Sequence, residues 1–120
     1  MLKQKKILQS LILILVLVGS SYGQYNNEIV VYSQEDVNGT TYGYRIPSLL
    51  TTAKGTLLAF AERRVGFHDH AQNDIVLKRS EDNGQSWHKM QVIADYGKSS
   101  LNDPLAVELK SGRILLMFKE

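Results

Sequence analysis

Short apolar segments alternate with turn-forming residues along most of the chain. The clearest turns are Ala53-Lys54-Gly55, Asp82-Asn83-Gly84 and Ser111-Gly112, where glycine and short polar side chains favour reversal of the backbone. Apolar segments bounded in this way predict antiparallel strands joined by hairpins. The segments are 28–33, 42–52, 56–64, 74–80, 90–95, 105–110 and 113–120. We therefore predict an all-β fold, with no helix after the first 23 residues.

The first residues follow a different pattern. Lys3, Lys5 and Lys6 precede a mostly apolar segment, 7–18, and the small residues Ser21 and Gly23 follow. This order is typical of a secretory signal peptide. A retained membrane anchor is the alternative, but the apolar segment is well short of the ~20 residues that span a bilayer. We expect cleavage after residue 23, and a mature chain that is secreted, periplasmic or exposed at the cell surface.

Export changes the charge balance of the protein. The whole chain has 14 Lys+Arg and 12 Asp+Glu, and the first 23 residues hold three of the lysines and none of the acids. Without them, eleven basic side chains face twelve acidic ones, and the basic ones are scattered, which argues against a nucleic-acid partner. The chain contains no cysteine. An exported domain without disulfides is held by its core alone, which fits a bacterial secreted or surface protein.

The segment SEDNGQSW, residues 80–87, combines a polar turn with the only tryptophan. Asp82 can accept hydrogen bonds from the turn, and Gly84 can adopt the positive φ that other residues resist. Trp87 is expected to start the next strand and to pack against the neighbouring sheet layer. Ser80, Asp82, Gly84 and Trp87 are therefore predicted to stabilise a hairpin, outside any active site.

This pattern resembles the Asp-box, S-x-D-x-G-x-[ST]-W, of sialidases and some other β-propellers. Three more segments resemble sialidase motifs in the same order: YRIPSLL (44–50), LLAFAERR (57–64) and NDP (102–104). Together they cover nearly all of residues 24–120 and identify the chain as similar to exo-α-sialidases, or neuraminidases, of the bacterial and animal type. The resemblance implies an all-β, six-bladed propeller. Because such a propeller needs several hundred residues, we expect residues 24–120 to be the amino-terminal part of the catalytic domain, about one blade and the start of the next.

Arg45 is the candidate for gripping the carboxylate of sialic acid, for which a planar guanidinium is suited; the resemblance implies that it is one of three such arginines. If Lys54-Gly55 is a two-residue hairpin loop, Arg45 lies opposite Arg64. A three-residue loop would instead pair Arg45 with Arg63. Two opposed arginines repel each other, and either a ligand or a carboxylate such as Glu62 would offset that repulsion. The resemblance places Arg64 near the 4-hydroxyl of the sugar.

Asp69 is the candidate acid. A glycosidase needs a carboxyl group on a loop that reaches the glycosidic oxygen, with a pKa raised by its pocket, and the spacing of Asp69 matches the acid/base aspartate of sialidases. Asp74 is the alternative, but its place at a strand start favours a structural hydrogen bond. His68 and His70 admit a metal interpretation, but two histidines without cysteine or a third ligand are a weak zinc signal. We expect no metal and no cofactor.

The resemblance places Asp103, and with it Asn102, in a loop facing the 4-hydroxyl region of the sugar, although an aspartate before proline is also a common turn. The implied activity is hydrolysis of terminal α-linked sialic acid from glycoconjugates, so the expected partners are sialylated glycans. The nucleophilic tyrosine, its glutamate and the other two arginines are expected beyond residue 120. The alternatives are a carbohydrate-binding or adhesive Asp-box propeller without catalysis, and a propeller glycosidase or lyase of other sugar specificity.

Overall fold

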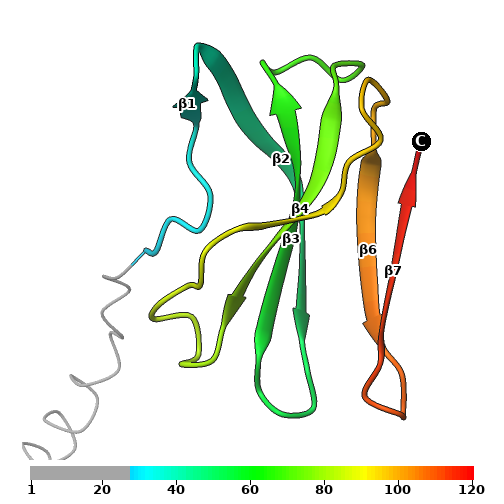
Figure 1. The fold of residues 1–120 in the computed structure, drawn as a ribbon. Coiled ribbons are helices and arrows are strands. Elements are labelled where there is room, and N and C mark those ends of the chain that lie inside the picture. The colour runs from blue at the N-terminus through cyan, green and yellow to red at the C-terminus, as the bar shows by residue number, and fades with distance from the viewer. Residues whose placement is uncertain (1–27) are drawn as a thin grey trace, which may run out of the picture.

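The computed structural model describes residues 28–120, and the predicted signal peptide at 1–23 lies outside these described residues. The described part is built from strands alone, so it holds no helix that could cross a membrane. Five strands form one antiparallel sheet in chain order, and two more form a hairpin beside it (Figure 1). The strands are β1 (Glu35–Val37), β2 (Thr40–Thr51), β3 (Leu57–Val65), β4 (Asn73–Ser80), β5 (Gln91–Ala94), β6 (Asn102–Glu108) and β7 (Ile114–Lys119).

The core lies where β3 and β4 pack under β6. Both central strands are buried along most of their length, in keeping with neighbours on their two edges and a second sheet over one face. Leu58 and Phe60 of β3 pack with Ile75 and Leu77 of β4, and Ala106 of β6 closes the same cluster. This arrangement is all-β, as predicted, and is consistent with one blade of a β-propeller followed by the start of the next.

Six of the predicted strand segments are confirmed as β2 to β7, but the first is wrong. Residues 28–34 form no strand, and pairing starts only at Glu35, which faces Tyr42. Tyr32 holds this segment against the sheet through its side chain, since its hydroxyl donates to the carbonyl of Ala59 at 2.7 Å and its ring stacks on Tyr44. The apolar pattern of the segment therefore reflects side-chain packing and not a ladder of backbone hydrogen bonds.

The predicted register between β2 and β3 is also wrong. Arg45 lies opposite Glu62, neither opposite Arg64 nor opposite Arg63. A β-bulge causes the difference, because Ile46 and Pro47 together face one residue of β3 and shift the pairing by one. Proline has no N–H to give to a ladder, and Ile46 has a φ of 50°, so regular pairing stops there.

A second bulge interrupts β6. The pairing with β7 shifts between Asn102 and Leu105, and Asp103 has a φ of 57°. The sequence predicted a loop for Asn102 and Asp103, whereas the structure places both in a strand that bulges just before Pro104. The two prolines of the chain thus each follow a residue with positive φ inside a bulge. Such conformations are costly for residues other than glycine and cluster at functional sites.

The turn after β4 has the hydrogen bonds predicted for it. Asp82 accepts from the backbone N–H of Ser86 at 2.9 Å and from the hydroxyl of Ser80 at 2.8 Å, while the N–H of Gly84, whose φ is 86°, donates to Ser80 Oγ. Hydrogen bonds from Ser86 and Ser80 lower the pKa of Asp82 to about 2. Trp87, however, does not start the next strand, which begins at residue 91. It is half-buried and lines a cavity with Tyr32 and Tyr44.

Candidate functional site

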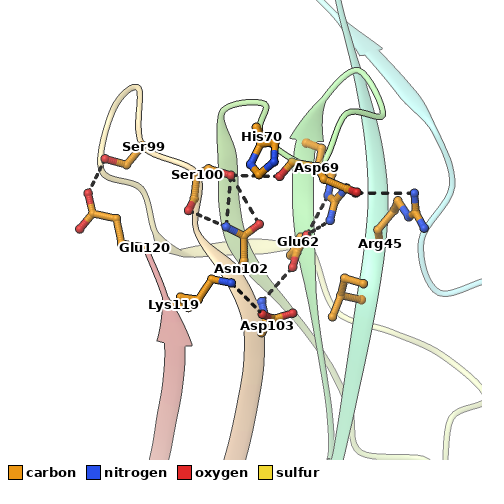
Figure 2. Close-up of a pocket in the computed structure, with 12 residues that line it drawn as sticks. Arg45, Glu62, Asp69, His70, Ser99, Ser100, Asn102, Asp103, Lys119 and Glu120 are labelled. Carbon is orange, nitrogen blue, oxygen red and sulfur yellow. Dashed lines mark hydrogen bonds and ion pairs between the residues drawn. The ribbon is translucent and has the colours of Figure 1, made fainter.

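A cavity of about 630 Å³ opens where the two bulges face each other across the sheets. It collects side chains from β2, β3, the loop after β3, the segment before β6, and β6 and β7 themselves, as Figure 2 shows. All six residues named as site candidates from the sequence lie around it: Arg45, Glu62, Arg64, Asp69, Asn102 and Asp103. The lining residues are Arg45, Ile46, Glu62, Arg64, Asp69, His70, Ser99, Ser100, Asn102, Asp103, Lys119 and Glu120.

The register of β2 and β3 places three charged residues on one face. Arg45 and Glu62 are directly opposed, so their side chains leave the same side of the sheet, and Arg64 follows Glu62 on that side because side chains alternate along a strand. The bulge therefore replaces the expected pair of like charges with a pair of opposite charges. The position opposite Arg64 is occupied by Gly43, which has no side chain to compete for the space.

Arg64 is the buried centre of the site, with a side chain that is 4% exposed. Its Nε donates to Glu62 Oε2 at 2.7 Å, and its Nη1 donates to Asp69 Oδ1 at 2.5 Å. Burial alone would lower the pKa of Arg64, but the hydrogen bonds that Arg64 donates to Asp69 and Glu62, together with the charges of these carboxylates, raise its pKa above the usual range. The guanidinium therefore stays charged and is held by carboxylates on two sides.

Arg45 and Asp69 are the exposed members of the site. Their side chains are 52% and 74% exposed, and Arg45 Nη1 lies 4.0 Å from Asp69 Oδ1. The structure thus brings together the guanidinium from the first long strand and the carboxylate from the loop after the second (Figure 2). An exposed pair at this distance contributes little to stability, so Arg45 is free to exchange Asp69 for another partner, while Asp69 remains bound to Arg64.

The expected rise in the pKa of Asp69 is not found. The hydrogen bond from Arg64 and the charge of that guanidinium lower the pKa of Asp69 below its usual value, and Arg45 and His70 act in the same direction. The prediction was wrong because it considered the shape of a pocket and not the two arginines that lie beside the carboxyl group. Asp69 is ionised in this arrangement.

Glu62 connects β3 to β6. It is completely buried, and its Oε1 accepts the backbone N–H of Asp103 at 2.8 Å, while its Oε2 accepts from Arg64. The side chain of Asp103 remains exposed, with Lys119 Nζ 3.7 Å from its Oδ2. The bulge in β6 therefore turns the Asp103 backbone toward Glu62 and leaves the Asp103 carboxylate at the cavity.

Asn73 is a residue of the site that sequence reasoning missed. It is completely buried at the start of β4, and its side-chain amide hydrogen-bonds with Ser100 Oγ at 3.0 Å and with the side chain of Asn102 at 2.9 Å. Ser100 in turn donates to the carbonyl of Asp69 at 3.4 Å. Asn73 thus links both the acid-bearing loop and the start of β6 to the core. Its position beside Asp74 was the only signal for it in the sequence.

Asp74, the alternative acid, lies outside the cavity. Its carboxylate, which is 5% exposed, pairs with Arg63 at 2.6 Å, and the Arg63 guanidinium lies over the ring of Tyr42. Residues 63 and 74 face each other in the β3–β4 ladder, so this pair fastens the two strands. Within residues 28–120, no group of three or more His, Cys, Asp or Glu side chains is arranged to hold a metal ion.

No protein-family model matches the chain. Among curated proteins it is similar to a sialidase of Paraclostridium sordellii, with 39% identity over 92 residues that make up 72% of this chain and 23% of that protein. It is 41% identical over 59 residues to a sialidase of Bacteroides fragilis, covering 46% of this chain and 10% of the relative. It is 35% identical over 94 residues to sialidase-3 of Bos taurus, and these residues make up 73% of this chain and 22% of the relative. The chain therefore spans less than a quarter of the length of these relatives.

Proposed function

Because this chain belongs to the sialidase family, we propose that it forms the first part of the catalytic propeller of an exo-α-sialidase, which hydrolyses terminal α-linked sialic acid from glycoconjugates. The observation that carries the proposal is the meeting of Arg45 and Asp69 in one cavity, 4.0 Å apart. One side chain can hold an anionic sugar, and the other can move a proton. The downstream blades would supply the nucleophile, and "full-length protein" below means residues 24–120 with those blades.

Arg45 suits the carboxylate of the sugar. Its side chain is half exposed, and among the described residues its only ion pair is the long one with Asp69. A guanidinium presents a planar fork of N–H donors that matches a carboxylate, and charge-assisted bonds of this kind are stronger than neutral ones. An arriving carboxylate can therefore displace Asp69 from Arg45 at small cost.

Arg64 suits a neutral group instead. Its charge is balanced by the buried Glu62, and three of its five N–H groups are used by Glu62 and Asp69. A guanidinium that already pairs with two carboxylates gains little from a further anion, but it can still donate to a hydroxyl. Together with the exposed carboxylate of Asp103 and the amide of Asn102, it forms a wall of donors and acceptors suited to sugar hydroxyls.

Asp69 is proposed to protonate the leaving oxygen, which requires its pKa to rise once substrate is bound. The substrate carboxylate supplies that rise, because it adds a negative charge beside Asp69 and takes over the Arg45 guanidinium that now stabilises the ionised form. The acid would thus be prepared by the same anion that identifies the substrate. The exposed loop position of Asp69 lets it approach the glycosidic bond.

The second candidate function is sugar binding without catalysis, favoured by the ionised, doubly paired state of Asp69. The two functions differ in turnover. The full-length protein, incubated with α-sialyllactose, is expected to release free sialic acid at a rate proportional to its concentration. Saturable binding of sialyllactose, measured by calorimetry, without any release would contradict the enzyme and support the binding protein.

We also propose that residues 1–23 direct export and are then removed. The cationic start and the short apolar segment support this, although both lie outside the described residues. Amino-terminal sequencing of the exported protein is expected to begin near Gln24. An amino terminus at Met1 in a membrane-bound protein would support a retained anchor.

A further inference from the structure

Glu62 is the most buried charged group of the molecule, with 0% exposure among residues 28–120. A carboxylate in such a place is costly unless its oxygens are all satisfied. Both are: Oε2 accepts two N–H groups of Arg64, and Oε1 accepts the N–H of Asp103. With no exposed surface and both oxygens engaged, Glu62 has no free acceptor to offer a ligand, and it acts through its two neighbours.

The bulge in β6 is built around this carboxylate. Asp103 adopts a φ of 57° although it precedes a proline, which normally favours an extended backbone. The unusual conformation turns its N–H out of the β6–β7 ladder, and Glu62 is the group that receives it at 2.8 Å. This hydrogen bond therefore offsets the cost of the positive φ at Asp103. The same backbone conformation leaves the Asp103 carboxylate at the cavity.

We propose that Glu62 is a positioning residue that sets the geometry of Arg64 and Asp103 and limits how strongly the Arg64 charge acts on Asp69. This inference rests on the proposed function, in which Asp69 is the proton donor. Glu62 and Asp69 share one guanidinium, because Arg64 donates to Glu62 from Nε and Nη2 and to Asp69 from Nη1. The shared pairing leaves Asp69 bound by only part of the Arg64 charge.

The other groups that face Asp69 do not replace this effect. Arg45 approaches from β2 and His70 from the same loop, and both favour the ionised carboxylate. Ser100, from the segment before β6, contacts only the backbone carbonyl of Asp69. The carboxylate of Asp103 is paired with Lys119. Glu62 is therefore the negative charge that weakens the effect of the Arg64 charge on Asp69. Removing the charge of Glu62 is expected to make Asp69 harder to protonate.

The first test needs no catalysis. The titration of Asp69 is followed by carbon NMR of aspartate-labelled full-length protein, with its signal assigned by its loss in Asp69→Asn. In Glu62→Gln the pKa of Asp69 is expected to fall by about half a unit or more. Glu81→Gln, which removes an exposed carboxylate paired with Arg79 and His88 outside the cavity, is the matched control and should leave it unchanged. An unchanged or raised pKa of Asp69 in Glu62→Gln would overturn the proposal.

The second test uses turnover and separates position from charge. Glu62→Asp keeps the charge but withdraws the carboxylate, so kcat/KM for sialyllactose should fall about 10- to 100-fold with the basic limb of the pH profile unmoved. Glu62→Gln should reduce kcat/KM by a similar factor and should also move the basic limb of the pH profile to lower pH. When Arg64 is already replaced by Met, the further loss of kcat/KM caused by Glu62→Gln should be several-fold smaller, because no buried guanidinium is left unpaired.

The outcomes distinguish the two proposals. If the unaltered full-length protein releases no sialic acid, the proposed function fails, and the NMR titration still decides the inference about Glu62. If the unaltered protein is active but the Glu62 variants share its pH profile and its kcat/KM, the function stands and the positioning role is overturned. If Glu62→Gln alone does not fold, the double variant with Arg64→Met, in which both charges are removed together, must regain the native melting transition; a double variant that stays unfolded contradicts a role exerted through Arg64.

Discussion

Gly43 lies on β2 next to the start of the loop that carries Asp69, the proposed acid. It lies buried on β2 opposite Arg64, and a methyl group added there would come 2.5 Å from the Phe67 ring and 2.9 Å from the carbonyl oxygen of Gly66. Phe67 is 53% exposed and can turn away. Gly66 cannot move so easily, because its N–H donates to Thr41 at 2.9 Å. Gly43→Ala is therefore expected to displace the backbone where the Asp69 loop begins.

The magnitude follows from these contacts. Overpacking against backbone typically costs about 1–3 kcal/mol, which should lower the melting temperature of the full-length protein by about 2 °C or more. A displaced acid loop should also reduce kcat for sialyllactose by about tenfold, since small misplacements of a catalytic group are expensive. Thermal unfolding followed by circular dichroism and initial rates of sialic acid release measure the two effects.

A second variant separates the two clashes. If the ring of Phe67 were the only obstacle, Phe67→Ala combined with Gly43→Ala would restore the melting temperature of Phe67→Ala alone. Because the Gly66 carbonyl remains in place, we expect only partial restoration. A Gly43→Ala protein that melts and turns over like the unaltered protein would refute the inferred coupling between β2 and the acid loop.

Three further predictions concern the carboxylate grip, the turn and the isolated segment. Arg45→Lys should raise KM for sialyllactose about tenfold or more with little change in melting temperature, because the side chain is exposed and only its forked hydrogen bonds are lost; an unchanged KM would argue against the grip. The folded pKa of Asp82, about 2, lies below its ordinary value of 3.8, so its stabilisation is fully present above pH 3.8 and is lost as the pH falls through 2. Asp82→Asn should accordingly lower the melting temperature at pH 7, and the difference should shrink below pH 3.8 and vanish only below pH 2. A purified segment of residues 24–120 should release no sialic acid and should bind hydrophobic dyes, because apolar side chains such as Leu105, Ile114 and Met117 are exposed; measurable release would contradict this.

The strands could be predicted wherever turn residues bounded them. Asp82-Asn83-Gly84 and Ser111-Gly112 form turns because their glycines take the positive φ that reversal requires. The segment 28–33 was mistaken for a strand because apolar content does not distinguish packing by side chains, as Tyr32 packs, from pairing by the backbone. That distinction depends on contacts with Ala59 and Tyr44, which are distant in sequence.

The predicted register of β2 and β3 was wrong for a reason that is visible in the sequence. Pro47 lies in the middle of a strand, and proline within a sheet marks an edge or a bulge. A bulge placed there moves Arg45 from Arg64 to Glu62. Pro104 likewise marks a bulge in β6, where the sequence predicted a loop.

The motif resemblance implied that Arg45, Arg64 and Asp69 face one sugar, but it could not predict their charge states. The pKa of Asp69 depends on a guanidinium five residues away that the loop folds back to meet. The buried Glu62 and Asn73 contribute through hydrogen bonds to β6 and to the segment before it, 41 and 27 residues farther along the chain. Pairings of this kind follow from the tertiary fold and leave no local pattern.

The central claim is that Asp69 protonates the glycosidic oxygen of the leaving group, in a cavity where Arg45 binds the carboxylate of the sugar. The most direct measurement compares Asp69→Asn with the unaltered full-length protein on two substrates, α-sialyllactose and an aryl α-sialoside whose phenolic leaving group needs little protonation. We predict that kcat for sialyllactose falls about 10²- to 10⁴-fold, while kcat for the aryl substrate falls far less and KM changes little for either. Equal losses on both substrates, or a loss confined to KM, would contradict the account.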